Sequence, residues 1–279
     1  MLTEKNYKTI LNYKEDPHDE RDFIFSNSLH APIDRILSVA PSVVDHEFNM
    51  SQVKNQGTLG SCVGFAVVAM KEWQETREHL REVEDGKIDH RKGEEYDLSE
   101  SWLYWKCKEI DAWPKEEGTS IRYAMRVLNK IGVPCESAWP YNDMVKGSPE
   151  SWASLVSQWS LIDSYWRING LNELKAALLN GPVVLGIPCF VEIFYADITG
   201  YVSYPRNSSE IYGGHAITAV GYDDKLYGGI IKFKNSWGKY WGKNGYGYLP
   251  YEYINDFLWD AWACKDLSVT KEMLTKRTL

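Results

Sequence analysis

The chain has 279 residues, of which 44% are hydrophobic and 25% charged, a balance typical of a globular protein with one large core or two lobes. Its formal net charge of −8 argues against nucleic acid or an anionic membrane surface as a partner. The longest apolar runs, such as residues 63–70, are too short to span a bilayer.

The N-terminal stretch, residues 1–40, is polar and interrupted by proline, so it predicts an extension with little core of its own. Its only tight apolar cluster is Phe23, Ile24 and Phe25. We expect the extension to pack along the surface through this cluster.

The next part of the chain has helical periodicity. Residues 61–81 start with a buried apolar run and become amphipathic, which indicates a long helix. Residues 82–96 are highly charged and indicate a solvated loop. Further helices are expected at residues 99–111, at residues 119–131 with Thr119 as the cap, and at residues 172–180.

The pattern then changes to strands, expected at residues 183–187, 215–222, 229–234 and 245–250. The fold class is therefore α+β, with helices mainly in the first half and strands mainly in the second. Side chains that act together but come from different halves are expected to meet in a groove between them.

Cys62 follows a Gly-Ser turn and begins the first of these helices. At a helix N-terminus, free backbone N–H groups and the helix dipole favour the thiolate, which lowers the pKa of the thiol and makes it nucleophilic. The competing interpretation is that Cys62 is a small buried hydrophobic residue, as most free cysteines are.

Two residues far downstream favour the nucleophile. A thiol nucleophile needs a base, and the base needs a group that orients it. His215 stands at the head of an expected strand, and Asn235 ends the next one. An imidazole can take the thiol proton, while an amide oxygen on the other ring nitrogen fixes its tautomer.

Several motifs stand in one order along residues 40–260: Gln56, Gly60-Ser61-Cys62, Gly214-His215-Ala216, Asn235-Ser236-Trp237-Gly238, and the stretch 241–247. With this set the chain resembles the papain-like (C1 family) cysteine peptidases. The resemblance implies a two-lobe fold with the active site in the groove between the lobes. We expect an N-terminal extension at 1–40, a peptidase domain at 41–264 and a polar tail at 265–279. Within the domain, a helical lobe would cover about 55–168, and the N-terminal segment would join a β-rich lobe at about 169–264.

The resemblance also implies the roles of individual residues. Cys62 would be the nucleophile, His215 the general base and then the general acid, and Asn235 the residue that orients the imidazole. Gln56 would supply an oxyanion-hole amide beside the backbone N–H of Cys62, and Trp237 would shield the His–Asn pair. Substrate-binding residues are expected at Gly118, Thr119, Gly213 and Gly214. The resemblance implies neither a cofactor nor a metal.

The chain departs from the family at its cysteines. Leu59 stands where the family usually has a disulfide-bonded cysteine, and five cysteines without close spacing do not form a disulfide framework. The chain therefore looks more like the bacterial, archaeal or viral members. The first nine residues show no secretory signal, so we expect a cytoplasmic or virion-associated protein.

The predicted function is hydrolysis of peptide bonds in a peptide or protein substrate through a thioester acyl-enzyme. Alternatives are a thiol acyltransferase or cell-wall amidase on the same scaffold, and a non-catalytic binding or structural protein. Family zymogens carry a long helical pro-segment that runs backwards through the cleft, whereas this extension is short and interrupted by proline. We therefore expect that the chain needs no proteolytic maturation. The alternative is that the cluster at residues 23–25 reaches the groove and restricts access to it. The sequence leaves the substrate preference and the oligomeric state open.

Overall fold

The computed structural model describes residues 10–85, 96–196 and 198–267. Its elements combine helices with a sheet of seven strands, which agrees with the expected α+β class. The α-helices are α2 (Ile33–Ser38), α3 (Cys62–Glu84), α4 (Glu100–Ile110), α5 (Ile121–Lys130), α6 (Ala153–Ser157), α7 (Gly170–Leu178) and α8 (Tyr251–Phe257). Short 3-10 helices are η1 (Phe25–Ser28), η2 (Glu47–Asn49), η3 (Glu136–Ala138), η4 (Gln158–Ser160), η5 (Val191–Tyr195) and η6 (Leu226–Gly228).

The strands are β1 (Val43–Asp45), β2 (Ile162–Arg167), β3 (Val183–Phe190), β4 (Ile211–Asp223), β5 (Ile230–Lys234), β6 (Tyr246–Pro250) and β7 (Asp260–Asp266). They form an antiparallel sheet in the order β2-β7-β3-β4-β5-β6, and β1 pairs with β4. The central strand β3 is buried along its whole length, as expected for a strand covered on both faces.

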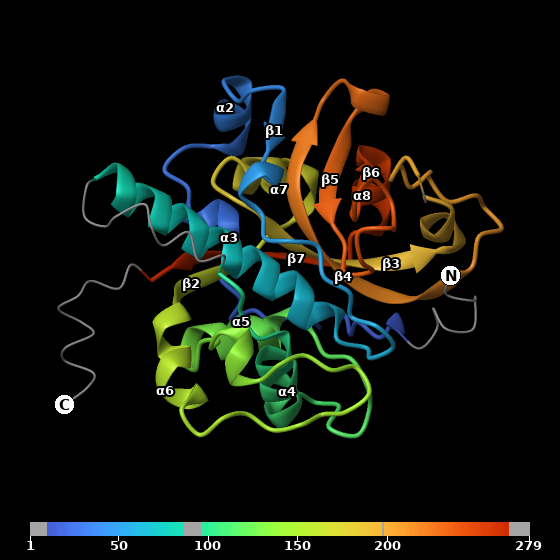
Figure 1. Ribbon diagram of the computed structural model, residues 1–279. Coiled ribbons are helices and arrows are strands. Elements are labelled where there is room, and N and C mark those ends of the chain that lie inside the picture. Colours follow the sequence, from blue (N-terminus) through green and yellow to red (C-terminus); the bar gives the residue numbers. More distant parts are fainter. Residues whose placement is uncertain (1–9, 86–95, 197, 268–279) are drawn as a thin grey trace.

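Two hydrophobic clusters correspond to two lobes. One packs α3, α4 and α5 against the sheet through Val184, Ala216 and Trp262. The other packs α7 and α8 against the alternate residues of β3, β4 and β7 and against β5 and β6. Figure 1 shows α4, α5 and α6 gathered on one side of α3, with α7, α8 and most strands on the other. The helix α3 therefore lies between these two groups, and its first residue, Cys62, shares the first cluster with Ala216 of β4.

Helix α3 is fixed against both lobes by close contacts. Thr218 in β4 donates its Oγ1 hydrogen to the carbonyl of Ala66, at 2.8 Å. On the opposite side, a Cβ at Gly64 would lie 3.2 Å from the carbonyl of Glu100 and 3.3 Å from Cβ of Tyr104. The lack of a side chain at residue 64 lets α3 and α4 approach closely, which fixes the position of Cys62.

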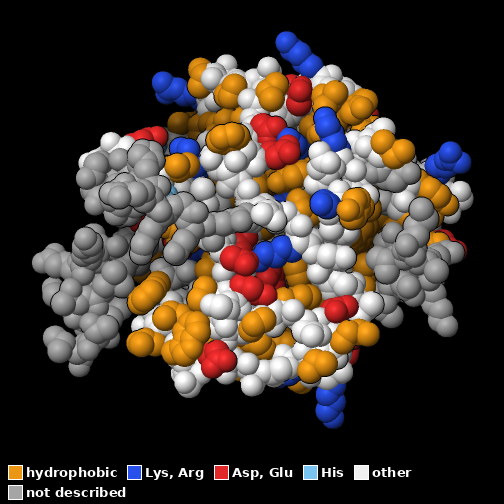
Figure 2. All heavy atoms as spheres, in the orientation of Figure 1, with side chains coloured by type: hydrophobic (Ala, Val, Ile, Leu, Met, Phe, Trp, Pro, Cys, Tyr) orange, Lys and Arg blue, Asp and Glu red, His pale blue; other side chains and the backbone are white. Residues whose placement is uncertain are grey.

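The surface of the molecule carries both charged and hydrophobic side chains. Figure 2 shows acidic and basic side chains meeting near the middle of one face, with hydrophobic side chains in separate groups around them. Within the described ranges, no helix has the length and hydropathy needed to cross a membrane.

Three expectations for the elements need correction. Thr119 does not cap α5; the helix starts after Ser120, and the carboxylate of Asp16 accepts the backbone N–H of Arg122 at 2.9 Å in place of a local cap. Helix α3 extends to Glu84, into the expected loop, and residues 86–95 of that loop lie outside the described residues. Asp266 of the expected tail belongs to β7, whereas residues 268–279 are not described.

Candidate active site

Cys62 is the first residue of α3, and its side chain has no exposed surface. Burial raises the pKa of the thiol to about 11, although backbone N–H groups of Ala216, Val63 and Cys62 itself act in the opposite direction. The helix start thus provides the donors that the sequence predicts, but desolvation is the larger effect. In this state the sulfur is a protonated thiol at neutral pH.

His215 lies in β4. The next residue, Ala216, donates its backbone N–H to the sulfur of Cys62. The Nε2 of His215 is 2.8 Å from Oδ1 of Asn235, the residue that follows β5. Its Nδ1 is buried and has no hydrogen-bond partner among the described residues. Burial lowers the pKa of His215 to about 4, and the hydrogen bond to Asn235 only partly opposes this. The imidazole is therefore neutral in this state.

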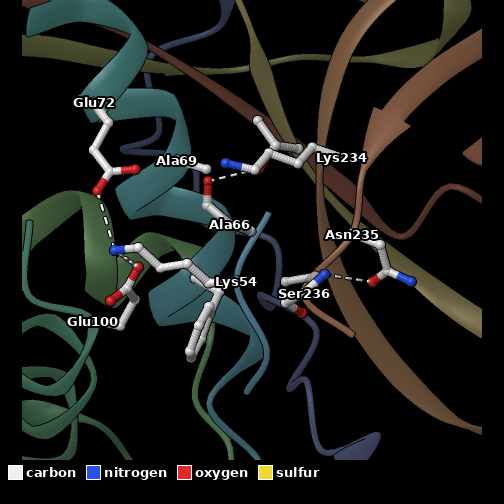
Figure 3. A pocket seen from close by; sticks show the side chains of 11 residues that line it. Lys54, Ala66, Ala69, Glu72, Glu100, Lys234, Asn235 and Ser236 are labelled. Carbon is white, nitrogen blue, oxygen red and sulfur yellow. Dashed lines mark hydrogen bonds and ion pairs between the residues drawn. The ribbon is translucent and has the colours of Figure 1, made fainter. Parts of the chain in front are cut away.

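Asn235 and Trp237 hold the imidazole in place. Oδ1 of Asn235 also accepts the backbone N–H of Ser236 at 2.8 Å, which fixes the orientation of the amide (Figure 3). The ring of Trp237 stacks on His215 with centroids 4.7 Å apart and an angle of 28° between the planes. Trp237 is itself buried, so it keeps water away from the His–Asn pair.

Gln56 is buried, and its side-chain amide is oriented by its neighbours. Its Oε1 accepts the hydroxyl of Ser236 at 2.6 Å, so Nε2 must point the other way, toward the carbonyls of Leu59 at 3.0 Å and Ile10 at 3.5 Å. The backbone N–H of Gln56 donates to the carbonyl of Ser236 at 2.9 Å. The loop that carries Gln56 is thereby joined to the segment that carries Asn235.

A cluster of charged side chains, formed by Lys54, Glu72 and Glu100, supports the loop that carries Gln56. Nζ of Lys54 lies 3.3 Å from Glu72 and 2.7 Å from Glu100, and burial raises the pKa of Glu100 to about 8. Figure 3 shows Lys54 between these two carboxylates, with Asn235 and Ser236 across a small cavity. Because the carbonyl of Lys54 also accepts the N–H of Gly238 at 3.0 Å, the cluster anchors the segment leading to Gln56.

The four expected substrate-binding residues surround part of the N-terminal extension. The N–H of Tyr13 donates to the carbonyl of Gly214 and the N–H of Lys14 to that of Thr119, both at 3.0 Å. A Cβ at Gly118 would lie 1.7 Å from the carbonyl oxygen of Asn12, and one at Gly213 would lie 2.3 Å from that of Leu11. Residues 10–14, which we call the inner arm, therefore occupy the groove between the lobes.

This placement contradicts the expectation of a surface extension held by an apolar cluster. Phe23 is 72% exposed, and only Phe25 is buried, while the main chain of Ile24 forms a bridge with Arg167. The physical reason is that Ile10, Leu11 and Phe25 enter the core of one lobe and Tyr13 that of the other, while ion pairs and main-chain hydrogen bonds fix the rest of the extension. With the inner arm in the groove, Cys62 has no exposed surface, so a peptide cannot reach it until the arm moves.

Two arginines, one in α5 and one in β2, hold a carboxylate of the N-terminal extension. Arg122 in α5 pairs with Asp22 through Nε at 3.0 Å and Nη2 at 2.6 Å, a bidentate geometry. Arg167 in β2 lies 3.6 Å from the same carboxylate. Asp16 is buried beside the start of α5, where it also accepts the hydroxyl of Ser120.

The sequence reasoning missed Tyr13, Asp16, Asp22 and Asp260 as part of the site. Tyr13, Asp16 and Asp22 of the N-terminal extension stand in a charged stretch that has the pattern of a solvated surface. Tyr13 and Asp260 are 247 positions apart, so no local signal indicates that they meet. Among the described residues, no group of three or more His, Cys, Asp or Glu side chains is arranged to hold a metal ion.

Comparisons with known proteins agree with this geometry. The model of the papain family cysteine proteases matches residues 40–256. An uncharacterized peptidase C1-like protein of Acanthamoeba polyphaga mimivirus is 27% identical over 92% of this chain and 86% of its own length. Zingipain-2 of Zingiber officinale is 30% identical over 70% of this chain and 79% of its own length.

Solved structures extend the likeness to the fold. Xylellain, a cysteine protease from Xylella fastidiosa, is 27% identical and has a TM-score of 0.77, covering 93% of this chain and 97% of the other. Digestive procathepsin L 3 of Tenebrio molitor, at 21% identity and a TM-score of 0.68, shares the fold over 95% of this chain and 79% of the other. The chain has the two-lobe papain-like fold, and it belongs to the papain family of cysteine proteases.

Proposed function

We propose that this cysteine peptidase uses Cys62 as its nucleophile, His215 as its base and acid, Asn235 to orient the imidazole, and Gln56 in its oxyanion hole. The observation that carries the proposal is the free Nδ1 of His215 on the side away from Asn235. With Nε2 committed to Asn235, only Nδ1 is left to exchange a proton with the thiol. The alternatives of an acyltransferase, an amidase or a non-catalytic protein are not favoured by a family of proteases.

The proposed reaction follows from these positions. The sulfur of Cys62 attacks the carbonyl carbon while its proton passes to Nδ1 of His215. The oxyanion that forms is held by Nε2 of Gln56 and the N–H of Cys62, and such a donor contributes about 3 kcal/mol. His215 then protonates the leaving amine, which leaves a thioester. A water molecule gives a proton to His215 and attacks the thioester, and the released thiolate takes the proton back.

The substrate is proposed to bind as an extended peptide against Gly118, Thr119, Gly213 and Gly214. The inner arm supports this, because its main chain already bonds to the carbonyls of Thr119 and Gly214. Glycines at three of these positions leave room for a backbone, as the close approach of the arm demonstrates. Hydrolysis therefore requires that the inner arm leave the groove, so the closed chain is a latent peptidase.

The test uses full-length chains in which the arm is loosened by Tyr13→Ala, called the opened variant below. It is expected to digest a mixed peptide library and to react with a peptidyl epoxide at Cys62. Adding Cys62→Ala should abolish both reactions while circular dichroism stays the same, whereas Cys135→Ala, at an exposed cysteine, serves as the matched control. Cleavage that persists without Cys62 would refute the assignment.

A cytoplasmic or virion-associated location belongs to the same proposal. It is supported by the similarity to a mimivirus protein along 92% of the chain. Fractionation of cells and particles that contain the protein, with detection by an antibody, tests the location. Recovery from a secretory compartment would contradict it.

A further inference from the structure

The side chain of Tyr13 fills a pocket beside the catalytic groove. Its ring stacks on Trp259 with centroids 6.3 Å apart and an angle of 24° between the planes. The ring belongs to a hydrophobic cluster that includes Val184, Ala216 and Trp262. Because Ala216 also donates its N–H to the sulfur of Cys62, the pocket is adjacent to the thiol. We call this space the Tyr13 pocket.

Gly186 shows that the pocket is built for a ring. A Cβ at this position in β3 would lie 2.2 Å from a carbon of the Tyr13 ring. The backbone of Gly186 is not in the left-handed region, since no positive φ is recorded for it. The absence of a side chain at residue 186 therefore makes room for the Tyr13 ring and is not needed for a special backbone conformation.

The pocket ends at a buried carboxylate. The hydroxyl of Tyr13 donates to Oδ2 of Asp260 at 2.6 Å, and the backbone N–H of Asp16 donates to the same oxygen at 3.2 Å. The other oxygen, Oδ1, accepts the indole N–H of Trp262 at 3.0 Å. When the inner arm leaves together with Asp16, Oδ2 loses both of its donors, whereas Oδ1 keeps its partner. The emptied pocket then has an apolar wall and an unpaired acceptor at its end.

The surrounding charges favour a neutral donor over a cation. The guanidinium groups of Arg122 and Arg167 lie over the ring of Trp262, at 5.5 and 5.7 Å from its centre, and Trp262 is the residue that bonds to Asp260. In the closed chain these arginines are paired with Asp16 and Asp22 of the extension, and Asp16 also faces Asp260. When the extension leaves, the two arginines lose these partners and stay near Asp260, so a lysine or arginine side chain would add to their positive charge. A phenylalanine ring would fill the pocket but leave Oδ2 of Asp260 without a hydrogen-bond donor. A tyrosine avoids this cost because its hydroxyl donates to Oδ2.

We propose that the Tyr13 pocket receives a tyrosine side chain of the substrate and that Asp260 selects it by accepting its hydroxyl hydrogen. This proposal rests on the peptidase function proposed above and names a preferred substrate residue for that site. Asp260 is then a specificity residue rather than a catalytic one, since it touches the substrate side chain away from the reacting bond. The arm holds the pocket with the same side chain that the substrate would place there.

The first experiment measures how strongly the pocket holds a tyrosine, without requiring turnover. In the full chain, Tyr13→Phe removes only the hydroxyl, and it is expected to raise the rate of epoxide labelling at Cys62 by about tenfold. In an Asp260→Leu background, Tyr13→Phe should change that rate less than twofold. Asp260→Asn is the more conservative partner if the leucine variant does not fold, and it should reduce the effect of Tyr13→Phe. Tyr165→Phe, a change near Trp262 outside the pocket, is the matched control.

The second experiment compares substrates with the opened variant. Two peptides that differ only by tyrosine or phenylalanine at one position, scanned along the sequence, should differ by about tenfold in kcat/KM at one position. Asp260→Leu should bring the two within about twofold. Equal cleavage of the two peptides at every position, or a tenfold preference for arginine over tyrosine, would overturn the proposal. If no peptide is cleaved although Cys62 is labelled and Tyr13→Phe acts as expected, the peptidase proposal fails instead.

Discussion

At the residue scale, burial moves the pKa values of the proposed catalytic pair apart. The thiol of Cys62 has a pKa of about 11 and the imidazole of His215 a pKa of about 4, both because the closed groove excludes water. A thiolate–imidazolium pair needs the opposite order of pKa values. The closed chain therefore holds a neutral thiol beside a neutral imidazole.

The charge state of His215 gives the first prediction. Since the pKa is lowered, the imidazole gains its proton only below about pH 4 and stays neutral from pH 5 to 8. A nuclear magnetic resonance titration of the full chain, with His215→Gln for assignment, should show no midpoint for this residue in that range. In the opened variant the pKa should rise, because a thiolate can then stabilise the imidazolium. A midpoint above pH 6 in the closed chain would contradict this description.

The second prediction concerns the orientation of Gln56. Gln56→Ala should lower kcat of the opened variant by about 10²–10³ with little change in KM, as expected for one oxyanion donor. Ser236→Ala removes the hydroxyl that holds Oε1 of Gln56, so a smaller loss of about tenfold is expected. Ser38→Ala, at an exposed hydroxyl bonded to a local carbonyl, is the control. An effect of Gln56→Ala on KM alone would mean that it binds substrate rather than the transition state.

At the element scale, the extension is held by contacts with α5 and β2. Asp22 pairs with Arg122 of α5 and Arg167 of β2, and Asp16 caps α5. Displacing the extension as far as Asp16 therefore also uncaps α5, and loss of such a cap costs about 1 kcal/mol. The extension and the helical lobe are thus expected to be coupled in stability.

The third prediction tests this coupling. Asp22→Asn should raise the epoxide-labelling rate of Cys62 by about tenfold, because a buried bidentate pair with Arg122 is lost. Asp19→Asn is the matched control, since Asp19 bonds to Arg21 within the extension itself. Equal rates for the two variants would show that the charges do not hold the arm.

Much of the element content could be predicted from the sequence, for identifiable reasons. Helices α3, α4 and α7 and strands β3–β6 have clear periodicity, so their positions were predicted to within a few residues, apart from the earlier start of β4 at Ile211. Strands β2 and β7 were missed because their aromatic residues, such as Trp166 and Trp262, fit a generic core as well as a strand. The position of the N-terminal extension depends on contacts 100 or more residues away, which no local pattern contains.

At the scale of the whole molecule, the two lobes place the proposed residues in one groove, and the extension closes it. Cys62 comes from the helix between the lobes, whereas His215 and Asn235 come from β4 and the end of β5. The proposed roles could be assigned from motif order, but the closed state could not. The boundary at residue 40 stays a prediction, to be tested by limited proteolysis, whereas β7 continues past the expected boundary at 264 to Asp266.

The fourth prediction concerns the cysteines. All five are free in the structure, and Cys62, Cys107 and Cys189 are buried. A denatured sample that has not been reduced should therefore titrate as five thiols. Two or fewer thiols would indicate that the protein forms disulfides and would contradict the expected reducing compartment.

The central claim is that residues 10–14 close a peptidase site built around Cys62. The measurement that tests it most directly is the time course of peptidyl-epoxide labelling in the full chain and in the opened variant, with peptide mapping of the adduct. We expect a single adduct on Cys62 that forms at least tenfold faster in the opened variant, since the loss of a buried aromatic ring weakens the closed state. An adduct on another cysteine, or equal rates in the two chains, would contradict it.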